Sequence, residues 1–190
     1  RGAFAVALPC MIAAPALNGF CLSLGPSLAA QVLRSPDLLW GGLVIFLVTG
    51  MGAAATVAFR RGVSGPAAML AGCLILLAGA AMTLAAIETA SAAAFLAGIA
   101  VAGAGSGMGF FLGAYRILTP LAGPGQRASL IAVIWIVFYL AFSVPAVIAG
   151  AATTHFGLHR TAVVYCAAVA VLAAAAAASL LSRSITAARS

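Results

Sequence analysis

The sequence contains no lysine and almost no acid. Its 190 residues include nine arginines but only Asp37 and Glu88 as acids, so 6% of the side chains are charged. A soluble domain usually carries about a quarter charged residues. Here 65% of residues are apolar and the mean hydropathy is +1.24. These values exclude a water-soluble globular protein, because too little polar surface is present to face water, and they predict that the lipid bilayer is the chain's solvent.

The positive charge does not indicate a nucleic-acid partner. The net charge is +7, but the arginines stand singly or in one pair at the ends of apolar runs. Such isolated cations are typical of residues that set membrane topology. We therefore expect no nucleic-acid binding.

The four cysteines show neither metal-site nor disulfide spacing. All lie inside apolar runs and none belongs to a CxxC pair; they are Cys10, Cys21, Cys73 and Cys166. This placement favours small packing residues. We predict no metal site and no cofactor.

Six apolar runs are long enough to cross a bilayer, which takes roughly 20 residues. Each must be helical, because a span in lipid has to satisfy its own backbone hydrogen bonds. The links between the runs are short, so successive helices should be antiparallel neighbours. The sequence thus predicts an all-α polytopic membrane protein with one transmembrane domain over residues 1–190 and spans at about 4–30, 39–59, 66–87, 92–118, 128–152 and 161–182.

The arginines divide unequally between the two ends of these spans. One side holds Arg34 and Arg160 together with both acids and both histidines. The positive-inside rule makes the opposite, arginine-rich side cytoplasmic. We expect a multi-pass protein of the plasma (inner) membrane with both termini in the cytoplasm, where seven arginines gather: Arg1, Arg60, Arg61, Arg116, Arg127, Arg183 and Arg189.

The turn FRRGVSGP and several helices resemble the major facilitator superfamily. That family's cytoplasmic turn reads roughly Gly-x-x-x-Asp-Arg-x-Gly-Arg-Arg; Arg60 and Gly62 match it, and Phe59 stands where the acid belongs. The stretches GFCLSLGPSLAAQVL, GMGFFLGAYRILTPLA and YLAFSVPAVIAG look like the seventh, tenth and eleventh helices of bacterial members. The likeness covers essentially the whole chain and lies in the order of its parts.

The resemblance implies the C-terminal six-helix half of a twelve-helix secondary transporter. It also implies a missing N-terminal half as partner, which would explain a chain that begins at Arg1. A small solute would move by alternating access, with spans one, two, four and five lining the path and spans three and six against lipid. In this setting Arg60, Arg61, Gly62, Arg116 and Arg127 would serve cytoplasmic closure and orientation.

The residues themselves suggest substrate-path positions in the first and fourth spans. Asn18 lies near mid-membrane in a span that contains three prolines, so it could face a wet cavity or bond a neighbouring helix or a freed carbonyl. In the fourth span Ser106 and Tyr115 are weaker candidates, and Arg116 is either an interfacial anchor or a gate. Glycines four apart in this span predict close helix packing, and they would also suit a helix that slides: Gly105, Gly109 and Gly113, with Gly103 and Gly107 as a second stripe.

In the fifth span, Trp135, Tyr139 and Ser143 lie four residues apart and share one face. This face could line a cavity or pack against another helix. No Asp, Glu, Lys or His lies in the middle of any span, so a proton-coupling residue would have to lie elsewhere.

Two other interpretations remain. Ser106 in AGSG suggests an intramembrane serine protease, but His155 and His159 lie in an outer link, too far to activate it, so we expect no enzyme activity. Those histidines have no third ligand nearby for a metal. The second alternative is a non-transporting scaffold or helper subunit, which would need no difference in polarity between inner and outer spans.

Overall fold

The computed structural model describes the backbone of residues 2–35, 37–121, 123 and 125–189, and the side chains of 7–35, 37–120, 123 and 125–182. Every regular element in the described chain is helical. In chain order they are α1 Gly2–Ser23, α2 Gly25–Leu33, α3 Leu38–Ala58, α4 Gly65–Thr89, α5 Ala92–Gly107, η1 Met108–Ala114, α6 Tyr115–Leu118, η2 Thr119–Leu121, α7 Arg127–Phe156 and α8 Leu158–Arg189.

Five described helices are long and apolar enough to cross a membrane. They are Leu38–Ala58, Gly65–Thr89, Ala92–Leu118, Arg127–Phe156 and Leu158–Ser182. The bent pair Ala7–Ser23 and Gly25–Leu33 makes a sixth if it is one span. This confirms the predicted all-α class, and by length and composition the helices identify a multi-pass membrane protein.

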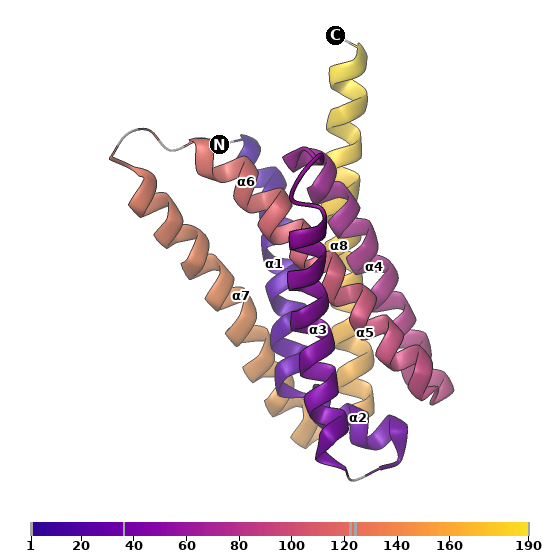
Figure 1. Cartoon of the computed structure of the whole chain (residues 1–190). Helices are drawn as coiled ribbons and strands as arrows, with labels where there is room; N and C mark the ends of the chain where they lie inside the picture. Colours follow the sequence, from indigo (N-terminus) through magenta and orange to yellow (C-terminus); the bar gives the residue numbers. More distant parts are fainter. Residues whose placement is uncertain (1, 36, 122, 124, 190) are drawn as a thin grey trace.

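The helices alternate in direction, so the chain's described ends lie at the same end of the bundle (Figure 1). The α3–α4 turn and the start of α7 lie at that end too, while the α2–α3, α4–α5 and α7–α8 links lie at the other. The predicted grouping of links is therefore present in the fold. Which end faces the cytoplasm stays a prediction.

The first predicted span is not one helix. The chain breaks at Leu24, and α1 and α2 meet at a 61° bend. Pro26 lies in the first turn of α2 and has no N–H to continue the hydrogen-bond ladder of α1, which accounts for the break. Pro9 and Pro15, by contrast, lie inside an unbroken α1.

The other boundaries differ from prediction mainly at the last link. The stretch TTHFGLHR, predicted as a link, is helical except for Gly157. That residue has φ +79°, a conformation that residues with a side chain rarely adopt, so one glycine makes the whole turn between α7 and α8. The last helix also runs beyond 182, to Arg189.

The predicted glycine stripes of the fourth span are confirmed, and they face two different helices. A Cβ on Gly105 would collide with the backbone of Leu76 in α4, and one on Gly113 with Met69. A Cβ on Gly103 or Gly107 would instead collide with the backbone of α3. The span therefore packs backbone to backbone against α4 on one side and α3 on the other.

Burial is uneven among the spans. In the most apolar window of each helix, 67% of the residues of Ala92–Leu118 are buried but only 11% of those of α7. Figure 1 shows why: α7 leans away from the other helices toward its start at Arg127. Near its middle α7 does touch α1, where a Cβ on Gly19 would collide with the Phe142 carbonyl.

Candidate functional site

The structure brings together two of the five predicted substrate-path residues. The Asn18 amide of α1 donates a hydrogen bond to the Ser106 hydroxyl of α5 across 2.7 Å, and another to the Ala14 carbonyl at 3.0 Å. Ser106 in turn donates to the same carbonyl at 3.5 Å and is 4% exposed. This is the second of the two interpretations given for Asn18, a bond to a neighbouring helix. The substrate contact stays a prediction.

The Asn18–Ser106 pair is not fully buried. Asn18 is partly exposed, and no hydrogen bond among the described residues uses its Oδ1 atom. The Asn18 Oδ1 atom can therefore still accept a hydrogen bond, while the amide N–H groups of the same side chain are held by Ser106 and Ala14. An amide held this way could bond one N–H or O–H group of a small solute.

Trp135 and Tyr139 belong to an aromatic cluster that joins α7 to η1. Trp135, Phe138 and Tyr139 contact one another with ring centroids 5.2 to 5.9 Å apart, and Phe138 lies 4.9 Å from Phe110 of η1. Trp135 is half-buried, whereas Tyr139 is 62% exposed. Ser143, on the same face, donates to the Tyr139 carbonyl at 2.6 Å, so its hydroxyl is occupied. Part of the predicted face therefore packs against η1, and part of it, at Tyr139, is exposed.

Tyr115 does not join either group. It begins α6, its side chain is half-buried against the main apolar core, and its carbonyl accepts a bond from Thr119 at 2.6 Å. Just before it lies a feature that the sequence reading missed: residues Met108–Ala114 form a π-helix. Such segments occur mostly as insertions in α-helices, frequently at functional sites. The glycines of this stretch predicted close packing and gave no signal for a π-helix.

The predicted cytoplasmic turn is held by an arginine from another helix. Arg116 donates to the Arg60 carbonyl at 2.8 Å and to the Val63 carbonyl at 3.4 Å. Gly62 occupies the turn with φ +89°. Arg60 and Arg61 are exposed, and Arg127 is exposed at the start of α7. Four of the five residues in this predicted set thus gather around or within one turn, while Arg127 begins α7.

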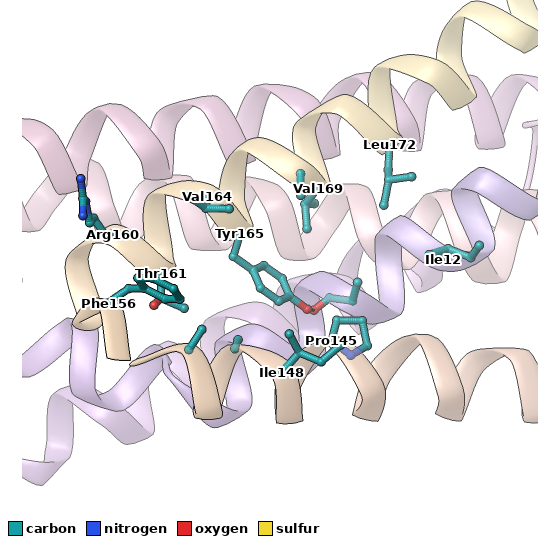
Figure 2. A pocket seen from close by; sticks show the side chains of 14 residues that line it. Ile12, Pro145, Ile148, Phe156, Arg160, Thr161, Val164, Tyr165, Val169 and Leu172 are labelled. Atoms are coloured by element: carbon teal, nitrogen blue, oxygen red, sulfur yellow. Dashed lines mark hydrogen bonds between the residues drawn. The ribbon is translucent and has the colours of Figure 1, made fainter. Parts of the chain in front are cut away.

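An apolar groove that the sequence reading did not anticipate lies between α1, α7 and α8. Its volume is about 690 Å³. Figure 2 shows Arg160 with Phe156 and Thr161 at one end, the Tyr165 ring along the middle facing Pro145 and Ile148, and Leu172 with Ile12 at the other. None of the five predicted substrate-path residues lines it.

Tyr165 fixes one wall of this groove. Its hydroxyl donates to the Ala16 carbonyl of α1 at 2.8 Å, and its ring stacks on Phe20 at 4.6 Å. Tyr165 thus links α8 to α1 near the middle of α1, the proline-containing helix. Tyr165 is the only aromatic residue in the alanine-rich last span, 161–182, and this was the signal for the contact.

At the opposite end of the bundle from the arginine turn, His159 and Glu88 approach within 3.7 Å. Both side chains are at least half exposed, so this contact is solvent-screened. His155 lies on α7 near Phe156. Within the described ranges no three or more His, Cys, Asp or Glu side chains gather as a metal-binding group.

Comparisons with protein-family models, with curated proteins and with solved structures find no match to this chain. The major facilitator resemblance therefore remains an interpretation of the sequence, and the helices are the part of it that the fold supports.

Proposed function

We propose that the chain is one six-helix half of a secondary transporter of the major facilitator type, which moves a small solute across the plasma membrane by alternating access. Both termini would be cytoplasmic, and a second six-helix half would complete the path. The helices would rock against that half around a site near the middle of the membrane.

The observation that carries the proposal is the face of α7. This helix is the least enclosed of the candidate spans, yet the surface it presents includes Tyr139 and Trp135 and not only aliphatic side chains. Lipid-facing surfaces at mid-depth are usually aliphatic, while tyrosine and tryptophan prefer the membrane interfaces. An aromatic, hydroxyl-bearing face in the middle of a span suits a solute path or a partner half better than it suits hydrocarbon.

Two further features are compatible with movement around such a path. The partly exposed Asn18, held by Ser106, offers a free amide oxygen close to the crossing of α1 and α7 at Gly19. The π-helical segment between α5 and α6 offers a point at which the fourth span could change its register.

Water accessibility tests the proposal without knowledge of the solute. Tyr139→Cys in the full chain, in intact membranes, should react with a membrane-impermeant maleimide, because a solute path is wet and a thiol reacts as the thiolate. Val171→Cys is the matched control: Val171 is 67% exposed on α8, where we expect lipid, and should stay unlabelled. The four native cysteines are buried and give the background.

Labelling should depend on the side from which the reagent is added, and it should change when the protein is trapped in one state. If Tyr139→Cys and Val171→Cys are equally unreactive from both sides, lipid or another protein covers the face, and it does not line a wet path. In that case a scaffold or helper subunit becomes the better description. A second experiment measures uptake of a panel of solutes by the full-length protein. Asn18→Ala and Tyr139→Phe should change KM or kcat for the transported solute. If both variants keep the unaltered values, neither residue lies on the path.

A further inference from the structure

The groove between α1, α7 and α8 has the dimensions and polarity of a site for a single hydrocarbon chain. Its walls are almost wholly apolar along its length. The two hydroxyls that line it are already engaged, since Thr161 donates to Gly157 at 2.9 Å and Tyr165 donates to Ala16. A ligand in the groove would therefore meet no unpaired polar group except at the end near Arg160.

Arg160 distinguishes that end. It is exposed, and no carboxylate lies within salt-bridge distance of it in the described part of the chain. It also lies in the first turn of α8, where the helix dipole disfavours a cation. The helix itself gains nothing from a positive charge at this position, whereas an anion from outside would be attracted by both the guanidinium and the dipole.

The length of the groove matches one leaflet. From Arg160 to Leu172 it follows α8 over about 18 Å, at 1.5 Å per residue. Half of a bilayer's hydrocarbon core is about 15 Å thick. A partner helix would need to run through both leaflets, but a lipid chain occupies one.

We propose that this groove binds one acyl chain of an anionic phospholipid, with the lipid phosphate bound by Arg160. The chain would lie against Tyr165 and Pro145 and reach Leu172 and Ile12. This site is separate from the aromatic face of α7 and does not depend on the proposed transport activity, because binding is measured on the purified protein without a solute.

The test is lipid binding to the full, delipidated chain in detergent, followed by native mass spectrometry. Palmitoyl-oleoyl phosphatidylglycerol should bind one per protein, about tenfold more tightly than the phosphatidylcholine with the same chains. Arg160→Gln should abolish this difference and leave phosphatidylcholine binding unchanged. Arg34→Gln, an exposed arginine away from the groove, is the charge-matched control and should retain it.

A second pair of variants tests the groove itself. Ala152→Phe places a ring in the groove, whereas Ala151→Phe places the same ring on the exposed side of α7. The first should weaken both lipids about tenfold or more, and the second should weaken neither. Circular dichroism reports whether each variant keeps its helices.

Salt provides a measurement on the unaltered protein, in case Arg160→Gln does not fold. Raising the ionic strength should weaken phosphatidylglycerol but not phosphatidylcholine. Equal affinity for the two lipids, or an Ala152→Phe variant that binds both normally, would overturn the proposal. So would full displacement of the lipid by inorganic phosphate, which would indicate an anion site without a chain, or a dimer mass in place of lipid adducts.

Discussion

Asn18 of α1 and Ser106 of α5 are joined by a 2.7 Å hydrogen bond between residues 88 positions apart in the chain. The bond links the proline-containing first span to the glycine-rich span that packs backbone to backbone against α3 and α4. Both residues are small and polar in a chain that is 65% apolar, and each is the other's partner. In hydrocarbon the alternative to such a bond is an unsatisfied polar group, so the pair fixes how these two spans are rotated relative to each other.

A double-mutant cycle should therefore detect coupling between the two positions. Asn18→Ala, Ser106→Ala and the double variant are compared by reversible unfolding in mixed micelles. Interhelical hydrogen bonds in membranes contribute on average about 0.6 kcal/mol and up to about 1.7, and we expect a coupling free energy within this range. A coupling indistinguishable from zero would mean that the bond contributes nothing to stability.

The glycine stripes predict a sharp contrast between two identical substitutions. Gly105→Ala brings a methyl group into the backbone of Leu76 and should lower the free energy of unfolding by about 1–3 kcal/mol, because helix backbone cannot move aside cheaply. Gly150→Ala, with nothing within 4 Å of the new methyl, should be neutral or stabilise by up to about 1 kcal/mol through helix propensity. Equal effects at both positions would contradict the backbone-to-backbone packing.

The sequence was sufficient for the spans and for the glycine contacts because both depend on local patterns. Apolar runs set the positions of the helices within a few residues, and glycines four apart predict a surface that another helix approaches closely. Arg116 was also predicted to lie at the same end of the bundle as the α3–α4 turn, and it does. Its carbonyl partners, Arg60 and Val63, could not be predicted, because they depend on where the α3–α4 turn lies in space.

The rotation of each helix about its axis is what the sequence left open. Asn18 and Ser106 were both candidates, but no local pattern indicates that they face each other. The groove could not be predicted for the same reason, since residues of three helices, α1, α7 and α8, form it together. The break at Leu24 was not predicted: all three prolines of the first span were visible, but only Pro26 lies where the helix ends, while Pro9 and Pro15 lie inside α1.

Arg116 should control the order of the arginine turn. Arg116→Ala removes two hydrogen bonds to carbonyls of residues 60 and 63, and water replaces them because the site is exposed. We expect a loss of about 1 kcal/mol in local opening free energy, or roughly fivefold faster amide exchange in residues 59–64. Arg61→Ala removes a neighbouring exposed arginine that makes no such bond to any described residue, and it should leave the exchange rates unchanged. Identical amide exchange rates in the two variants would show that the turn is stable without the Arg116 hydrogen bonds.

Tyr165 and Tyr139 allow the last prediction, because one hydroxyl is bonded and the other is not. Tyr165→Phe keeps the ring stacked on Phe20 but loses the 2.8 Å bond to the Ala16 carbonyl, which links α8 to α1. It should lower the free energy of unfolding by about 0.5–1.5 kcal/mol. Tyr139→Phe removes a hydroxyl that makes no hydrogen bond within the described chain and should leave stability unchanged. Thermal unfolding of the two variants in the same detergent measures the difference. A larger loss for Tyr139→Phe would assign the stabilising contact to the α7 face, and the link between α8 and α1 would then rest on ring packing alone.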